Sequence, residues 1–317
     1  MKILKTLTSA FIVLSYFAIQ GVPLSSCTKT NTVHDTTTVT IHDTTSLTIR
    51  DTVTVKDTVT ITGDPGNLSD GLVAYYNFNG GNLNDSSGHG NNIVFNNATP
   101  TEDRFGNPES AYLFDGRSSY MTVKNSASIN PNKISIYAII KVYGFNQDGC
   151  HGNQILSKGY PYNVNGFYAL SFYPYNNSVG GVCNPNADTT KEFFAGGFGD
   201  NIPLGVAAGS WGNSSSDSVY VQKYQWYTLV FTYDGTTSKF YVNGALARTT
   251  VNTGTVTFTP NSNDLFIGKH ENPLYPYYFN GVIDEIRIYN KVITNRQVQY
   301  MRIFKDKYLK VNNKLIH

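Results

Sequence analysis

The sequence is poor in charge, and its charges nearly balance. Charged residues make up 15% of its 317 residues, and 24 basic side chains stand against 22 acidic ones. Lys2 and Lys5 account for the excess and lie in a segment that we expect to be removed, so the mature chain would be neutral. A neutral surface has no field that attracts nucleic acid or an acidic membrane, and we expect no nucleic-acid partner.

Motifs of common catalysts are also missing. The sequence has no Gly-x-Ser-x-Gly, no His-Glu-x-x-His and no phosphate-binding loop. Retaining glycosidases need two carboxyl groups about 5–5.5 Å apart, and we find no such set spaced along one strand. Asp284 and Glu285 are adjacent, so on a regular strand they point to opposite faces. Glu192 and Glu271 are isolated in loop-like sequence. We therefore expect no enzyme.

The N-terminus carries a targeting signal. Lys2 and Lys5 precede an apolar run, residues 7–19, that is short for a membrane anchor, and no second run of spanning length follows. The sequence Leu24-Ser25-Ser26-Cys27 resembles the bacterial lipoprotein box. That resemblance implies that residues 1–26 are a signal peptide and that Cys27 is acylated, with roughly 0.8 kcal/mol of anchoring per buried CH₂. An ordinary secreted protein with a chance cysteine is the alternative.

Residues 27–67 form a second compositional region, rich in threonine and almost free of aromatic residues. A unit recurs in it as His-Asp-Thr-Thr, Arg-Asp-Thr-Val and Lys-Asp-Thr-Val. Such a strip buries too little apolar area to offset its ordering entropy, so we interpret it as an extended stalk, with pairing between copies as the alternative. Each unit also resembles the acceptor of a bacterial O-glycosylation system, which implies glycans on Thr36, Thr44, Thr52 and Thr58; a chance pattern in a threonine-rich strip remains the alternative.

Residues 68–305 read as an all-β domain, because short aromatic and β-branched runs alternate with turn residues. The expected strands cover residues 72–78, 111–114, 120–123, 134–142, 154–157, 166–172, 193–198, 226–233, 239–242, 245–249, 265–267 and 282–289. Asp234-Gly235 and Asn243-Gly244 predict tight hairpins, and the glycines at 196, 197 and 199 predict a turn or bulge. Thr294 opens a short C-terminal helix with a capping-box spacing, and residues 306–317 form a tail.

Four stretches of this domain together resemble one known family. They are Gly71-Leu72-Val73-Ala74-Tyr75-Tyr76-Asn77-Phe78-Asn79, the segment from Trp226 to Gly235, Lys239-Phe240-Tyr241-Val242-Asn243-Gly244, and the segment from Phe279 to Asn290. These resemble the landmarks of laminin-G-like, concanavalin-A-like jelly-roll domains. The resemblance implies an antiparallel β-sandwich and a binding protein.

The expected function is non-catalytic recognition of a glycan or polysaccharide by an envelope lipoprotein. The expected location is the outer membrane of a Gram-negative bacterium, on the cell surface or the periplasmic face, with the acyl anchor as the only membrane contact. Two alternatives stay open. One is a protein-binding, adhesive or structural surface module with an envelope protein as partner, and the other is a diverged glycoside hydrolase.

The resemblance also implies a structural Ca²⁺ ion that joins the two ends of the domain. Its ligands would be Asp85 and Asp284, with help from Asn92, because Ca²⁺ prefers carboxylate, amide and carbonyl oxygens. The alternative is that Asp85 only organises a turn and that Asp284 accepts nearby backbone N–H groups.

The region between residues 143 and 211 is unusually aromatic, and aromatic faces beside amide side chains suit sugar rings. The residues expected to bind a ligand are Tyr160, Tyr162, Tyr175 and Trp211, whereas Tyr168 is expected in the core. Tyr275-Pro276-Tyr277-Tyr278 is a second aromatic loop of similar standing. Cys150 and Cys183 remain after Cys27; a disulfide between them would stabilise the fold by roughly 3–4 kcal/mol, with two free thiols as the alternative.

Overall fold

The structure is a computed structural model. It describes residues 66–146, 152–159, 166–175, 178–179, 182–183, 186, 188–199, 220–251 and 258–307, in some cases, such as Tyr175 and Cys183, by the backbone alone. Residues Asn67–Val298 form one compact unit, and the described residues from Gln299 onward are assigned to a second one. All the described strands lie in the first of these units.

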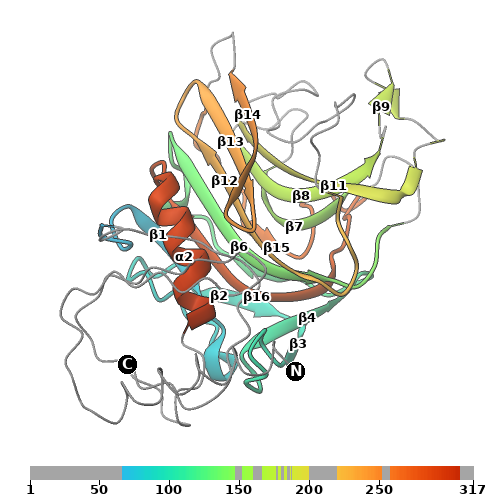
Figure 1. The fold of residues 1–317 in the computed structure, drawn as a ribbon, viewed down its shortest axis with the longest axis horizontal. Helices are drawn as coiled ribbons and strands as arrows, with labels where there is room; N and C mark the ends of the chain where they lie inside the picture. Colours follow the sequence, from blue (N-terminus) through green and yellow to red (C-terminus); the bar gives the residue numbers. More distant parts are fainter. Residues whose placement is uncertain are drawn as a thin grey trace, which may run out of the picture. The chain divides into compact units, whose positions relative to one another are not determined.

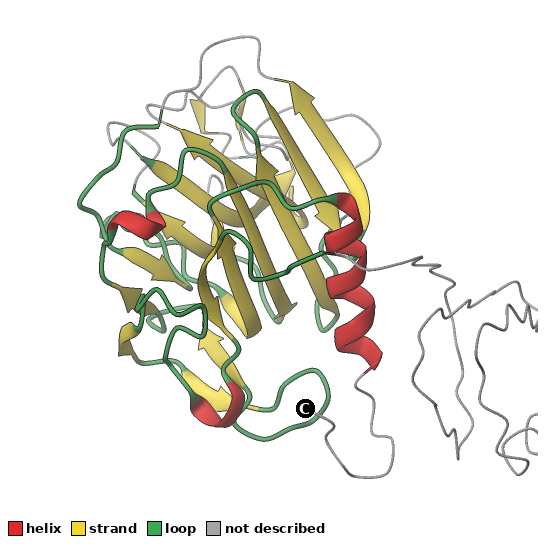
Figure 2. Cartoon of the chain, turned by 90° about the vertical axis from the view of Figure 1, so that its left-hand side faces the viewer, coloured by secondary structure: helices red, strands yellow, loops and turns green. Residues whose placement is uncertain are grey.

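Strands make up most of this unit, as Figure 2 shows. Apart from short 3-10 turns, the helix described in this part of the chain is α2 (Asn295–Lys307), whose first residues belong to this unit. The strands are β1 (Leu72–Tyr76), β2 (Ile93–Asn96), β3 (Thr99–Thr101), β4 (Ala111–Asp115), β5 (Met121–Val123), β6 (Ile134–Val142), β7 (Asn153–Lys158), β8 (Phe167–Tyr175), β9 (Ser178–Val179), β10 (Val182–Cys183), β11 (Asp188–Gly199), β12 (Trp226–Tyr233), β13 (Thr237–Val242), β14 (Ala245–Val251), β15 (Leu265–Ile267) and β16 (Asn280–Tyr289).

The larger sheet, which we call sheet A, has the order β14-β13-β12-β6-β16-β4-β3, with β1 also on β16. All of its pairings are antiparallel. One edge of β16 pairs with β6, and its other edge pairs first with β4 and then with β1. The first and last strands of the domain are therefore neighbours, as predicted.

The second sheet, sheet B, has the order β11-β8-β7-β15-β5-β2, and β9 and β10 form a separate short ribbon. Its pairings are also antiparallel. Sheets A and B form the two layers of a sandwich, which can be followed in Figure 1. The predicted all-β antiparallel sandwich with a short C-terminal helix is confirmed.

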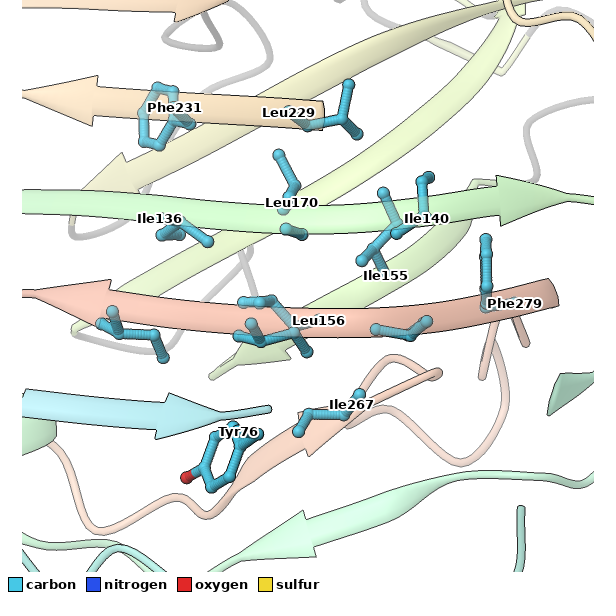
Figure 3. Close-up of a cluster of buried hydrophobic side chains, with 14 of the residues drawn as sticks. Tyr76, Ile136, Ile140, Ile155, Leu156, Leu170, Leu229, Phe231, Ile267 and Phe279 are labelled. Carbon is cyan, nitrogen blue, oxygen red and sulfur yellow. The ribbon is translucent and has the colours of Figure 1, made fainter. Parts of the chain in front are cut away.

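The core lies between these two layers. Figure 3 shows Ile136 and Ile140 from β6 with Leu229 from β12, facing Leu156 from β7 and Leu170 from β8. All five side chains are fully buried. Alternate residues of each strand share this face, because successive side chains point to opposite sides of a sheet. The residues between them therefore point away from the core, and these outward residues form the surfaces of interest.

Local sequence signals set most of the element ends. Asn243 and Gly244, with φ of 51° and 78°, make the β13–β14 hairpin turn, as the Asn-Gly pair predicts. At α2, the Gln297 N–H donates to Thr294 Oγ1 at 3.2 Å, and the Thr294 N–H donates to Gln297 Oε1 at 2.8 Å. The predicted capping box is confirmed.

Two expectations for β11 were wrong. Gly196 and Gly197 do not form a turn or bulge but pair within β11 with Leu170 and Ala169. A Cβ on Gly196 would lie 2.4 Å from the ring of Phe231, so the glycine lets the aromatic core approach the backbone. Glu192 is not in a loop either; it lies on β11 and is fully buried.

Candidate functional site

A row of aromatic side chains crosses the outer face of sheet B. Phe95 of β2 and Phe266 of β15 both lie opposite Thr122 of β5. The neighbours of Phe266 along β15, Leu265 and Ile267, belong to the core. Phe266 therefore points outward, and the strand pairing places Phe95 on the same side.

Tyr120, just before β5, completes this row. Its ring centroid lies 4.7 Å from that of Phe95 and 6.2 Å from that of Phe266. The Lys269 Nζ atom lies 4.2 Å from the Tyr120 centroid and 4.5 Å from the Phe266 centroid, within cation–π range. Phe95 is 43% exposed, and the other two rings are half-buried. We call Phe95, Tyr120, Phe266 and Lys269 the sheet B surface.

Backbone contacts hold Tyr120 in this position. Its N–H donates to Asn97 Oδ1 at 2.7 Å, and the Asn97 Nδ2 donates to the carbonyl of Ser118 at 3.1 Å. The Asn97 N–H also donates to the Tyr120 carbonyl at 3.3 Å. One asparagine thus bridges the end of β2 and the turn before β5, which fixes the backbone position from which the tyrosine ring projects.

An ionised carboxylate lies at the edge of the sheet B surface. Partial burial would raise the pKa of Asp115, but the N–H groups of Ser118, Arg117 and Ser119 all donate to it and hold its pKa well below the ordinary value. Burial is the main cause that raises the pKa of Tyr278, and Tyr120 and Asp115 add to that rise in smaller measure. An ionised carboxylate therefore holds the turn that leads into Tyr120.

The loop between β15 and β16 brings a second set of tyrosines. It is fastened to β7, because the Gly268 N–H donates to Ile155 O at 2.8 Å and the Gln154 N–H donates to Tyr277 O at 2.9 Å. The ring centroids of Tyr275 and Tyr277 lie 6.1 Å apart, and Tyr275 is 47% exposed. The loop that the sequence singled out, residues 275–278, is therefore ordered on sheet B with an exposed aromatic side chain.

The side chains of the four predicted ligand-binding residues are not described by the structure. Tyr160, Tyr162 and Trp211 lie outside the described residues, and Tyr175 ends β8 without a described side chain. Their role stays a prediction. Tyr168, expected in the core, is fully buried there. Sequence reasoning missed Phe95, Tyr120 and Phe266, because only strand pairing brings these distant positions together.

The predicted calcium ligand Asp85 has hydrogen-bond partners within the protein. Its carboxylate accepts the N–H groups of Tyr75, Ser87 and Asn91 at 2.8–3.0 Å, and the Ser87 hydroxyl at 2.8 Å. Asn92 Oδ1 accepts the Asp85 N–H at 2.8 Å. These contacts organise the loop after β1 in the way that an aspartate in a turn does.

Asp284, the other predicted calcium ligand, lies in a β-bulge. In the β16–β6 ladder Ile283 pairs with Ile140 and Glu285 with Ile139, so Asp284 is the extra residue. Its carboxylate accepts Arg104 Nη1 at 2.9 Å, and Glu285 accepts Arg287 Nε at 2.6 Å. A bound Ca²⁺ would have to share Asp284 with Arg104.

The bulge corrects the expectation that Asp284 and Glu285 point to opposite faces. Ile283 and Ile286 both belong to the core cluster, which places the two residues between them on the outer face together. The extra residue shifts the alternation by one position, which a strand pattern read from sequence alone does not reveal.

No group of three or more His, Cys, Asp or Glu side chains suited to a metal occurs in the part of the chain that the structure describes. Calcium at Asp85, Asn92 and Asp284 stays a prediction. Cys27, Cys150 and the four stalk threonines lie outside the described residues, and Cys183 is described by its backbone alone. Among the described helices, none is long and apolar enough to cross a membrane.

Comparison with known families decides the classification. Residues 115–299, more than half of the chain, match a laminin G family described as the concanavalin A-like lectin/glucanases superfamily. The chain belongs to this superfamily. The match covers both predicted hairpins and the closing strand β16, which are three of the four stretches that resemble concanavalin A-like domains. No curated protein matches the sequence.

Solved structures with a similar fold are distant in sequence. The binding domain of Paraclostridial mosquitocidal protein 1 is 12% identical with a TM-score of 0.51, over 76% of this chain and 54% of that one. The botulinum neurotoxin serotype D/C binding domain is 12% identical with a TM-score of 0.51, over 75% and 53%. This chain thus spans about half of the toxin domains.

A third structure is matched along almost its whole length. Domain 4 of AbnA, a GH43 extracellular arabinanase from Geobacillus stearothermophilus, was solved in complex with arabinotriose. It is 19% identical with a TM-score of 0.47, over 73% of this chain and 98% of that one. At these identities the likeness concerns the fold alone.

Proposed function

We propose that this concanavalin A-like domain is a non-catalytic glycan-binding module and that the sheet B surface contacts the sugar. The observation that carries the proposal is the row of Phe95, Tyr120 and Phe266 on one outer face, with Lys269 above two of the rings. Exposed aromatic faces match the apolar faces of sugar rings, and Lys269 supplies a donor for hydroxyl groups.

The carboxylates of the outer face of sheet A favour a non-catalytic role. Asp284 and Glu285 lie on one face, but each is buried and paired with its own arginine, Arg104 or Arg287. A general acid and a nucleophile need contact with substrate and separately adjusted pKa values. These two buried ion pairs have a structural role instead.

The proposed setting is the outer membrane of a Gram-negative bacterium. Acylation of Cys27 would anchor the chain, and the threonine-rich residues 27–67, with glycans on the four Asp-Thr units, would act as a spacer that presents the module to polysaccharide. Calcium at the loop of Asp85 would act as a structural ion.

Pull-down of the full chain with a panel of insoluble polysaccharides tests the proposed function. Phe95→Ala removes one exposed ring and should weaken retention roughly fivefold, because one aromatic contact contributes about 1 kcal/mol. Val94→Ala is the matched control, since Val94 is a neighbouring apolar residue that is 58% exposed. Retention of no polysaccharide by the native protein, or equal retention by Phe95→Ala, would overturn the proposal.

A protein-binding role is the second candidate, and strand β14 favours it. This strand pairs with β13 alone among the described strands, and Leu246 and Val251 on it are 53% and 66% exposed. An exposed edge with apolar side chains can add a strand from a partner. Crosslinking to an envelope protein that soluble sugars do not compete with, and that Leu246→Lys abolishes, would support this role.

A further inference from the structure

A second group of aromatic residues lies on the other sheet. Trp226, the first residue of β12, is directly opposite Lys141 of β6. Ile140 and Val142 belong to the core, so Lys141 points outward from sheet A, and Tyr143 follows on the same side. The Lys141 Nζ atom lies 5.6 Å from the Tyr143 centroid and 5.7 Å from the Trp226 ring.

Tyr224 extends this group into solvent. Its N–H donates to Val142 O at 2.7 Å, which continues the ladder between β12 and β6. Its ring centroid lies 5.5 Å from that of Tyr143, with the two planes inclined by 35°. The side chain is 68% exposed, so packing against the core does not explain its position.

The backbone of Tyr224 is unusual as well. Its φ of 65° lies in the left-handed region, which bulky residues rarely adopt and which costs on the order of 1–3 kcal/mol. A glycine or asparagine would satisfy this turn more easily. An exposed tyrosine held in a strained conformation beside another ring is better explained by what the ring contacts outside the protein.

Among the described residues, Lys141 is the cation within range of these rings, and Lys223 directly precedes Tyr224 in the chain. Lys223 is exposed, and its Nζ atom lies 4.7 Å from the Phe145 centroid. Neither Lys141 nor Lys223 forms an ion pair with an acid among the described residues. Burial raises the pKa of Glu192 to about 9, and Lys223 lowers it in smaller measure, so this nearby carboxyl is uncharged at neutral pH.

We propose that Lys141, Tyr143, Lys223, Tyr224 and Trp226, the sheet A surface, form a second binding site that takes acidic sugars. The rings provide the stacking faces, and the two ammonium groups meet the carboxylate or sulfate of the sugar. This site lies on the opposite sheet from the sheet B surface and rests on separate residues. One domain would therefore hold two glycan chains, and the second chain would be anionic.

Affinity electrophoresis of the full chain in matched gels tests this site. The probes are polygalacturonate against its fully methyl-esterified form, and dextran sulfate against dextran, so that each pair differs only in charge. The native protein should be retarded by at least one acidic polymer and not by its neutral partner. Retardation by polygalacturonate alone identifies a carboxylate ligand, and retardation by dextran sulfate alone identifies a sulfate ligand.

Three variants locate the site. Lys141→Gln and Lys223→Gln should each weaken binding of the acidic polymer roughly fivefold. Tyr224→Asn removes the ring but keeps a residue that tolerates the left-handed region, and a similar loss is expected. Lys133→Gln is the matched control, because Lys133 is an exposed lysine directly before β6, at the other end of that strand from Lys141, and this variant should bind as the native protein does.

The result that would overturn the proposal differs from the one that would overturn the proposed function. Retardation by no acidic polymer, or retardation unchanged in Lys141→Gln and Tyr224→Asn, excludes the sheet A surface. Loss of acidic-polymer binding in Phe95→Ala would show that the acidic polymer binds at the sheet B surface, and this result would also reject the proposal. Loss of neutral-glycan binding in Phe95→Ala alone supports two independent sites.

Discussion

The two aromatic surfaces of this domain use similar rings but different charges. The sheet B surface has Lys269 within electrostatic reach of Glu271, whereas Lys141 and Lys223 of the sheet A surface form no ion pair with an acid among the described residues. Aromatic faces provide contact area with any sugar, because every pyranose has an apolar face. Charge then decides which sugar is preferred, since an unpaired cation favours an anion and a mixed pair favours neutral hydroxyl groups.

The surfaces also differ in how the chain builds them. The sheet B rings come from β2, the turn before β5, and β15, which pairing brings together from distant positions. The sheet A rings come from the end of β6 and the start of β12, two neighbouring strands: Tyr143 follows β6, and Tyr224 precedes Trp226 of β12. The first surface therefore depends on the whole sandwich, and the second depends on one strand pair and one strained turn.

The largest expected effect comes from breaking the scaffold that both surfaces share. Arg104→Ala would leave the buried Asp284 without its arginine at the bulge of β16. Removing one partner of a buried ion pair costs roughly 3 kcal/mol or more, so the Tm should fall by several degrees and both binding activities should fall with it. Differential scanning calorimetry measures this; an unchanged Tm would mean that the pair is dispensable.

The uncharged state of Glu192 is open to a stability test. The pKa of Glu192 is about 9 in the folded protein, above the ordinary 4.5. The folded state is therefore most stable below pH 4.5, where the carboxyl is protonated in both states, and the free energy of unfolding falls as the pH rises toward 9. Between pH 6 and pH 8 the free energy of unfolding of the native protein should fall by about 2.7 kcal/mol, at about 1.36 kcal/mol per pH unit. Glu192→Gln should remove this slope in urea titrations, whereas parallel slopes in both proteins would show that Glu192 is not the cause.

Reversing the charge of the sheet A surface should separate the two sites most clearly. Lys141→Glu with Lys223→Glu should weaken acidic-polymer binding more than about tenfold, because attraction becomes repulsion. Binding of a neutral glycan through Phe95 and Phe266 should stay within about twofold. Isothermal titration calorimetry with each ligand measures both, and equal losses would show that only one site exists.

Salt should distinguish the surfaces in the native protein. Raising NaCl from about 0.05 to 0.5 M shortens the screening length severalfold, so acidic-polymer binding should weaken roughly fivefold. Neutral-glycan binding, which depends on ring contacts, should change little. If both respond to salt equally, the assignment of charge to one surface is wrong.

The smallest effect concerns the strained residue. Tyr224→Gly should raise the stability by about 0.5–1 kcal/mol, because glycine adopts φ of 65° without strain, while acidic-polymer binding falls. A gain in stability with a loss of binding is the signature of a residue kept for contact with a ligand. Chemical denaturation provides the measurement, and a loss of stability would show that the Tyr224 ring has a structural role instead.

Much of the fold could be predicted, because its strands are strongly patterned. The bounds of 134–142, 226–233 and 265–267 agree with the structure, and each of the other predicted strands exists with shifted ends. Strand β2 was missed because Val94 and Phe95 are both exposed and break the alternation. Strand β3 was missed because it contains Pro100, which is unusual within a strand.

The candidate sites were harder to predict, for a physical reason. The loop of Tyr275, Tyr277 and Tyr278 is visible in the sequence, because its aromatic residues are consecutive. The sheet B surface is not visible, because Phe95 and Phe266 meet only through the register of β5 between them. Sequence reasoning also missed Lys158, which is fully buried and donates to Asn130 and Asn261, so that burial lowers its pKa to about 8.

The sequence by itself determined the sandwich, the hairpin turns and the capped helix, because alternation, Asn-Gly turns and a capping box act over a few residues. Tertiary structure alone decided which side chains meet. The bulge at Asp284 put two carboxylates on one face, Gly196 let Phe231 pack against the backbone, and strand pairing assembled the aromatic surface of sheet B. These features depend on partners distant in the chain, and no local pattern encodes them.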